Sequence, residues 1–115
     1  MTKLFVQPGE EIPLAAPYDR LSGQGALVGA IFGVAMIDVL NTVTANFMIE
    51  GVHTLAKATG QTWTQGALIY WDNTAKNCTT TSTSNTRIGC AMSAQASGDT
   101  TGAVRLNGIA TPTGA

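Results

Sequence analysis

Few side chains in this sequence could act as a nucleophile, an acid or a base, and their spacing does not bring them together. The single histidine, His53, has no second histidine and no nearby cysteine at the spacing of a zinc site, which needs three or four protein ligands. Glu10 and Glu11 are adjacent, so in an extended chain their carboxylates point to opposite sides and cannot act as a pair. The sequence therefore predicts no catalytic residue, no metal site and no enzyme activity.

Thiol and nucleotide chemistry are not supported either. The first eleven residues, MTKLFVQPGEE, lack the apolar run and small-residue cleavage site of a secretory signal, so synthesis in a cytoplasm is expected. Because disulfides are rare in that compartment, Cys78 and Cys90 are expected to be reduced, structural thiols. Residues 23–29 (GQGALVG) lack the lysine and the spacing of a phosphate-binding loop, so no cofactor is predicted.

Charged side chains are scarce, which bears on the partners of the chain. The 115 residues are 44% hydrophobic and only 11% charged, against a usual charged share of about 25%. A surface with so few charges is poorly soluble alone, so we expect partner subunits to cover part of it. The six lysines and arginines are scattered among seven acids. Without a basic cluster to neutralise phosphates, no nucleic acid partner is predicted.

Three glycines, Gly25, Gly29 and Gly33, have the spacing of a packing motif in membrane helices, but the surrounding apolar run is short. Residues 26–37 give twelve uninterrupted apolar residues before Asp38, whereas a bilayer span requires about 20. No membrane segment is predicted. With alternate residues on opposite faces, the same stretch fits β-strands.

The stretch 25–52 recurs downstream, and this duplication organises the chain. Its landmarks return in the same order, with 66–69 (GALI) matching 25–28 (GALV), 89–92 (GCAM) matching 33–36 (GVAM) and 107–109 (NGI) matching 50–52 (EGV). The offsets of 41, 56 and 57 residues place 15 extra residues, including a Thr-rich segment, between the first two landmarks of the second copy. We expect two related hairpin units, one of them with an inserted hairpin.

Alternating hydrophobicity predicts strands throughout the chain. Between residues 43 and 49, apolar side chains recur at every second position, which is typical of a half-buried strand. Short strands at intervals of about ten residues, separated by Gly, Asn, Asp and Ser turns, indicate an all-β fold of the small barrel or sandwich type. At most one or two helical turns are expected, near 38–42 or 93–97.

The amino-terminal segment is expected to be extended, because it holds three of the four prolines. Two interpretations remain open for it: a first edge strand with a loose end, or an arm that becomes ordered on a neighbouring subunit. The predicted organisation is an arm over 1–20, a single β domain over 21–110 with pseudo-repeats at about 25–52 and 66–109, and a tail over 111–115.

Apolar and aromatic side chains are the candidates for contact with a partner, since such residues dominate the energetics of interfaces. The candidates are Phe5, Val6 and Leu14 on the arm, together with Trp63 and Trp71. For the two tryptophans, packing in the core is an open alternative, because large aromatic side chains in a small domain are mostly buried.

A set of landmarks in fixed order covers most of the chain, from about residue 5 to residue 108: 29–35 (GAIFGVA), Gly51-Val52, Lys57-Ala58, Gly66, 70–72 (YWD), Ile88-Gly89 and 104–108 (VRLNG). In their order and spacing these landmarks resemble the capsid cement, or head decoration, proteins of tailed bacteriophages. That family is catalogued as a domain of unknown function and sometimes labelled a RecA/RadA-like recombinase. The recombinase label does not fit these residues, because no phosphate-binding loop is available for ATP.

The resemblance implies a small β-tulip-like domain that forms a homotrimer and binds the major capsid protein. It also implies a place on the outer capsid surface of the virion, where the protein stabilises the mature head, after synthesis in the cytoplasm of the bacterial host. A second interpretation, of another class, is a carbohydrate-binding module displayed on the surface of a particle, in which exposed Trp and Tyr side chains stack on sugars.

Overall fold

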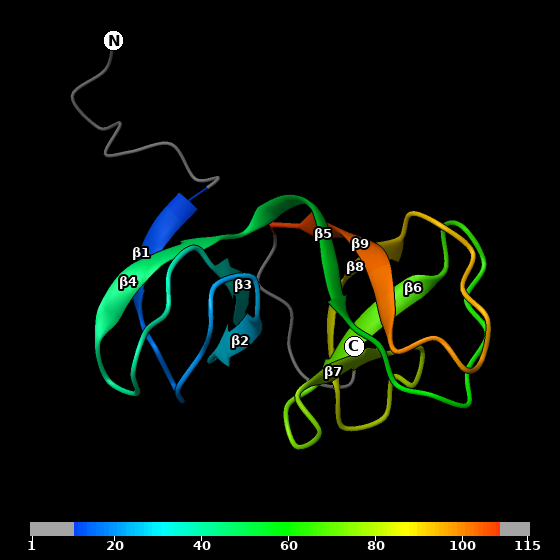
Figure 1. Cartoon of the computed structure of the whole chain (residues 1–115), viewed down its shortest axis with the longest axis horizontal. Helices are drawn as coiled ribbons and strands as arrows, with labels where there is room; N and C mark the ends of the chain where they lie inside the picture. Colours follow the sequence, from blue (N-terminus) through cyan, green and yellow to red (C-terminus); the bar gives the residue numbers. More distant parts are fainter. Residues whose placement is uncertain (1–10, 109–115) are drawn as a thin grey trace, which may run out of the picture.

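Nine β-strands and no helix are present in the computed structural model, which describes residues 11–108. In chain order the strands are β1 (Glu11–Ala15), β2 (Gly25–Val28), β3 (Ile31–Ala35), β4 (Thr44–Met48), β5 (Glu50–Ala56), β6 (Leu68–Asp72), β7 (Asn77–Thr79), β8 (Thr86–Ala91) and β9 (Thr101–Asn107). They form two antiparallel sheets, β1-β4-β3-β2 and β5-β9-β8-β6-β7, which lie side by side in Figure 1. The predicted all-β, sandwich-like fold is confirmed, although the sheets do not close into a barrel. At the two places where at most one or two helical turns were expected, residues 38–42 and 93–97, the chain forms turns and isolated bridges and no helix.

Strand β4 of the first sheet runs almost directly into β5 of the second sheet, with only Ile49 between them. β5 then pairs with β9 along its whole length, from Glu50 opposite Asn107 to Ala56 opposite Thr101. Figure 1 shows β4 and β5 as one ribbon that passes from one sheet to the other. The two sheets are therefore joined by the backbone itself, without an intervening loop.

The strand order of the first sheet recurs in the second, where β5-β9-β8-β6 repeats β1-β4-β3-β2 and β7 is added at one edge. The hydrogen bonds of the connecting segments recur as well. In the first sheet, Arg20 and Val39 each donate a backbone N–H to the carbonyl oxygen of the other, at 2.9 and 2.8 Å. In the second, Trp63 and Gln95 do the same at 2.9 and 3.1 Å. Arg20 is therefore structurally equivalent to Trp63, and Val39 to Gln95.

The hydrogen bonds correct one part of the alignment between the two copies. Gly23 donates its N–H to the carbonyl of Ala35 at 2.8 Å, and Gly66 donates to the carbonyl of Ala91 at 2.8 Å. Both glycines have a φ of 88°, in the left-handed region that favours glycine. Gly66 is thus equivalent to Gly23 and not to Gly25, which the sequence match pairs with it, because short identical runs of small residues do not define a hydrogen-bonding register.

The inserted residues of the second copy form β7 and the turns beside it. The β6–β7 turn is closed by Asp72, whose Oδ1 accepts the backbone N–H groups of Thr74 at 2.9 Å and Ala75 at 3.0 Å. Cys78 and Thr79 of β7 are both buried. The Thr-rich insertion therefore contributes to the core of the second sheet as well as to its surface.

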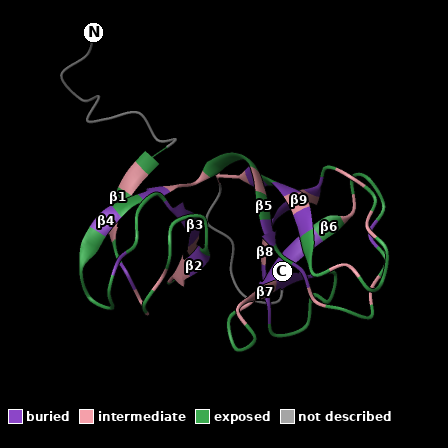
Figure 2. Ribbon diagram, in the orientation of Figure 1, coloured by how far each residue is buried: buried purple, intermediate pink, exposed green. Residues whose placement is uncertain are grey.

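Burial follows the expected alternation in β1, β4 and β9, as Figure 2 shows by colour. In β4, Ala45 and Phe47 are buried and their neighbours are more exposed. Strand β6 is one of those that depart from the alternation, and its register with β8 shifts between Ile69 and Tyr70. The irregularity turns consecutive side chains inward, so Ile69, Tyr70 and Trp71 are all buried.

The junction between the sheets is aromatic. Phe32 of β3 packs on Trp71 of β6 with ring centroids 5.0 Å apart and planes inclined by 52°, a favourable tilted arrangement. Beside this pair, the ring of Tyr18 is approached by two cations, the guanidinium carbon of Arg20 at 4.9 Å and the ammonium of Lys76 at 4.4 Å. Both sheets therefore contribute side chains to one shared packing region.

Candidate interaction surface

The two tryptophans predicted as partner contacts lie in the core. Trp63 is 0% exposed and Trp71 is 2% exposed. Trp63 occupies space that only glycine leaves free, since a Cβ added at Gly102 would lie 2.5 Å from its ring. Lys57 Nζ lies 5.6 Å from the centre of the same ring. Core packing, the alternative considered for these residues, accounts for both of them.

The other predicted contacts belong to the amino-terminal arm. Phe5 and Val6 lie outside the described residues. Leu14 is half-buried in β1 and packs against the core of the first sheet. Residues 11–15, which the sequence assigned to the arm, form the edge strand of the first sheet and pair with β4.

No cluster of metal-ligating side chains is assembled within residues 11–108. This part of the chain contains no group of three or more His, Cys, Asp or Glu side chains that could hold a metal ion, and no helix long and apolar enough to cross a membrane. Cys78 and Cys90 are free thiols, and burial raises the pKa of Cys78 from 9.0 to about 12, which disfavours the nucleophilic thiolate. His53 Nε2 lies 2.9 Å from the carbonyl oxygen of Glu50.

Apolar side chains are instead concentrated on the surface of two loops of the first sheet. Of the eight exposed large apolar residues within 11–108, five lie in the β1–β2 and β3–β4 connections: Leu21 (59% exposed), Met36 (42%), Ile37 (60%), Leu40 (66%) and Val43 (50%). Sequence reasoning missed this cluster, because it placed Met36, Ile37 and Val43 in strands and read residues 38–42 as a turn. The available signal was the density of large apolar residues between the turn-forming ones.

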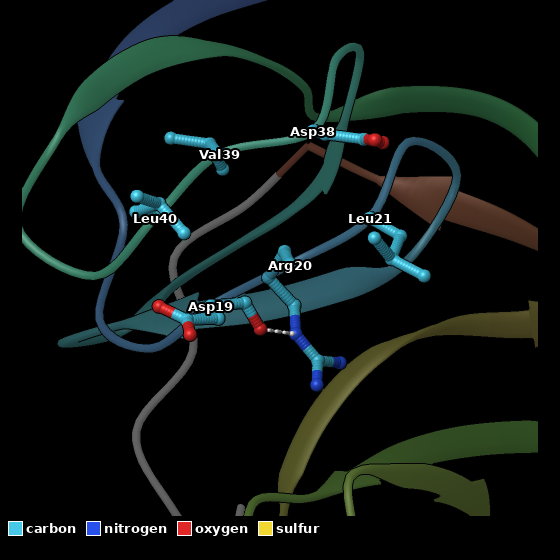
Figure 3. A pocket seen from close by; sticks show the side chains of 6 residues that line it. All are labelled: Asp19, Arg20, Leu21, Asp38, Val39 and Leu40. Carbon is cyan, nitrogen blue, oxygen red and sulfur yellow. Dashed lines mark hydrogen bonds between the residues drawn. The ribbon is translucent and has the colours of Figure 1, made fainter.

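The two loops enclose a hollow of about 370 Å³. It is lined by Asp19, Arg20, Leu21, Asp38, Val39 and Leu40, drawn as sticks in Figure 3. The Arg20–Val39 bridge holds the two loops together at this point. The guanidinium of Arg20 is engaged elsewhere, because it donates to the carbonyl oxygens of Asp19 at 2.7 Å and Gly25 at 3.3 Å. The hollow therefore has apolar walls from Leu21 and Leu40 and carboxylates at its rim.

Comparison with known proteins gives one match. The family described as phage cement protein matches residues 6–106, which is most of the chain. No curated protein and no solved structure matches the chain. The matched region includes both apolar loops and every described strand except the last residue of β9, Asn107. The chain belongs to the phage cement protein family, and with it to the structural proteins of the phage capsid.

Proposed function

We propose that the protein binds the outer surface of the capsid as a homotrimer, contacts the major capsid protein there, and stabilises the mature head. It would be made in the cytoplasm of the bacterial host and join the virion by binding alone. Each contact would contribute the free energy of burying apolar surface, about 25 cal/mol per Å². Because a trimer offers several contacts at once, detachment would be rare even where each contact is modest.

The observation that carries this proposal is the exposed apolar surface on the loops of the first sheet. Four of its side chains, Leu21, Ile37, Leu40 and Val43, are at least half exposed, although the same chain packs its tryptophans completely. Large apolar side chains that are gathered and exposed on two bridged loops favour contact with another molecule. Loops on a rigid β framework are suited to that task, because they can carry binding residues without altering the fold.

The arm supplies a second proposed contact through Phe5 and Val6, with Leu14 anchoring β1 to the first sheet. Deleting residues 1–10 removes both arm residues and leaves every described strand in place. We expect the shortened protein to keep its β-sheet circular dichroism spectrum and to bind heads more weakly. Full occupancy of heads by the shortened protein would remove the arm from the proposal.

Co-sedimentation with undecorated heads tests the function. The protein alone should remain in the supernatant, and with heads it should pellet to a saturating, integral copy number per capsomer. Heads already coated with the protein serve as the control, because their sites are filled. Decorated heads should also withstand heating to a higher temperature before releasing DNA. Absence of binding to undecorated heads would contradict the proposal.

The oligomeric state has its own test. Sedimentation equilibrium of the free protein, repeated over a range of concentrations, should give three times the chain mass of 11.9 kDa. If the trimer forms only on the capsid, chemical crosslinking of the head-bound protein should give a product of that mass. A monomer or dimer under both conditions would contradict the trimer and leave capsid binding intact.

Both tryptophans and Tyr70 are buried, which removes most of the basis for a carbohydrate-binding function. Stacking on sugars requires exposed rings, whereas Trp63, Tyr70 and Trp71 are at most 7% exposed. No observation on the described residues favours this second interpretation.

A further inference from the structure

The internal duplication allows the apolar loops of the first sheet to be compared with their equivalents in the second. The carbonyl oxygen of Leu21 accepts the N–H of Gln24 at 3.0 Å, and the carbonyl of Thr64 accepts that of Ala67 at 3.0 Å. These bonds make Thr64 the equivalent of Leu21. In the same position of the other copy, a small or polar residue stands where the first sheet exposes leucine.

The second loop shows the same contrast. The carbonyl oxygen of Val43 accepts the N–H of Ala16 at 3.0 Å, while the carbonyl of Thr100 accepts that of Lys57 at 2.8 Å. By this bond Val43 matches Thr100. A second pair of bonds, from the N–H of Val43 to Leu40 at 3.0 Å and from that of Asp99 to Ala96 at 3.1 Å, matches Val43 with Asp99, which is polar as well. Because the two bridges make Val39 equivalent to Gln95, the residues that follow them, Leu40 and Ala96, are equivalent as well.

The contrast shows that the fold does not require these apolar side chains. The second sheet forms the same strand order and the same bridges with threonine and alanine at the equivalent positions. In the first sheet, the side chains of Leu21, Leu40 and Val43 are 59%, 66% and 50% exposed, so they contribute little to its core. Apolar residues that neither the fold nor the core needs are explained by contact with another molecule.

The charge at these loop positions also differs between the two copies. Asp19 and Asp38 stand at the rim in the first sheet, whereas Thr62 and Ala94 occupy the equivalent positions in the second. Each carboxylate uses one oxygen to accept a backbone N–H, from Asn41 at 2.7 Å for Asp19 and from Ser22 at 2.8 Å for Asp38. Their charge is available to a partner.

We propose that this apolar loop face, formed by Leu21 and Leu40 around the hollow with Ile37 and Val43 beside them, seats on the capsid shell. The inference rests on the proposed function and specifies its contact: a large apolar side chain of the shell subunit enters the hollow, and a neighbouring lysine or arginine meets Asp19 and Asp38. Complementary charge selects this partner over a second copy of the same face. The lining carries two carboxylates, Asp19 and Asp38, and one guanidinium, Arg20, so a two-fold contact between two such faces would bring like net charges together.

Site-specific photocrosslinking locates the contact. The photoreactive residue p-benzoylphenylalanine replaces Leu40 in the full chain, and the matched control carries it in place of Ala96, the equivalent position of the second sheet. Both positions are exposed, so neither replacement disturbs the core. After binding to undecorated heads and illumination, the Leu40 variant should form a covalent product with the shell subunit, and the Ala96 variant should not.

Other crosslinked products would overturn the inference. A dimer of the chain would make the face a contact between copies, and an internal crosslink to residues 1–10 would make it the seat of the arm. Equal crosslinking from both positions, or none, would also contradict it. Wild-type protein is measured alongside: if wild type fails to pellet with heads, the proposed function itself fails, whereas binding by wild type without the Leu40 product overturns only this inference.

Exchanging residues between the two copies tests how much these loop side chains contribute to the free energy of binding to heads. Leu21→Thr combined with Leu40→Ala gives the first sheet the loop residues of the second, and we expect at least tenfold weaker binding to heads. The control is Leu68→Thr, which removes a leucine of β6 that is 51% exposed and should leave binding unchanged. Asp19→Asn with Asp38→Asn keeps the oxygens that accept the backbone N–H groups and should reduce the salt dependence of binding. Unchanged binding by the leucine pair would contradict the inference.

Discussion

Tyr18 and Asn73, 55 residues apart in the chain, are joined across the junction of the two sheets by a hydrogen bond of 2.8 Å from the tyrosine hydroxyl to the amide Oδ1. The same Oδ1 accepts Trp71 Nε1–H at 3.1 Å, and the tyrosine hydroxyl accepts the N–H of Leu27 at 3.2 Å. One amide oxygen thus links the first sheet to the β6–β7 turn and to the core of the second sheet.

Substitution at this link should weaken the junction. Tyr18→Phe removes one donor and one acceptor, and we expect the free energy of unfolding to fall by about 1 kcal/mol. Asn73→Ala should cost more, since it also leaves Trp71 Nε1–H without its partner. Urea denaturation measures both. In the double variant the losses should be less than additive, because the two residues share a bond; full additivity would contradict the link.

Gly89 should tolerate no side chain. A Cβ at this position of β8 would collide with the carbonyl oxygen of Arg105 on β9, and backbone atoms of a paired strand cannot move aside. We expect Gly89→Ala to lower the free energy of unfolding by about 3 kcal/mol. Gly98→Ala is the matched control, because no atom lies within 4 Å of its added Cβ. Equal thermal midpoints for the two variants would contradict the strand packing.

Cys78 should be protected from thiol reagents in the folded protein. Its side chain is 0% exposed and burial raises its pKa to about 12, so a thiol reagent at pH 8 should modify Cys90, which is partly exposed, and reach Cys78 only after denaturant is added. Mass spectrometry of the labelled peptides distinguishes the two sites. Rapid modification of Cys78 without denaturant would contradict its burial.

The same thiol should make stability depend on alkaline pH. The folded-state pKa lies above the ordinary value of 9.0, so the neutral thiol stabilises the folded state fully below pH 9, and that contribution is lost as pH rises toward 12. The expected slope approaches about 1.4 kcal/mol per pH unit. Cys78→Ala, less stable at pH 7, should lack this component, so its deficit relative to wild type should shrink between pH 9 and 10.5.

The ammonium group of Lys57, as well as its aliphatic chain, should contribute to the stability of the fold. It is 4% exposed, and its Nζ donates to the carbonyl oxygens of Gln61 at 2.6 Å and Ala58 at 3.0 Å. Lys57→Met keeps an apolar stem and leaves both carbonyls without this donor, so we expect a loss of about 2 kcal/mol in unfolding free energy. Arg105→Met, at an exposed position, should change stability by less than about 0.5 kcal/mol.

The all-β fold and the duplication could be predicted from the sequence, because both depend on local patterns. The alternation that buries Ala45 and Phe47 in β4 is visible in neighbouring residues. The register of the first landmark was not predictable in this way. Gly66 is equivalent to Gly23 through bonds to β3 and β8, and those partners lie far along the chain.

The surfaces were harder to predict, because exposure depends on distant residues. Trp63 is buried because Gly102 leaves room for its ring, and no local pattern around Trp63 reveals this. Leu21 and Leu40 are exposed because the Arg20–Val39 bridge fixes their loops at the surface. In both cases, the deciding contact joins segments that are distant in sequence.

The nearly unbroken ribbon of β4 and β5 has a mechanical consequence. A pull on the first sheet, along the strand direction, passes through Ile49 into β5 without a hinge to absorb it. The hydrogen bonds between β5 and β9 lie perpendicular to that pull, so they share the load in shear and must rupture together. A tether built in this manner resists tension far better than one that unzips bond by bond.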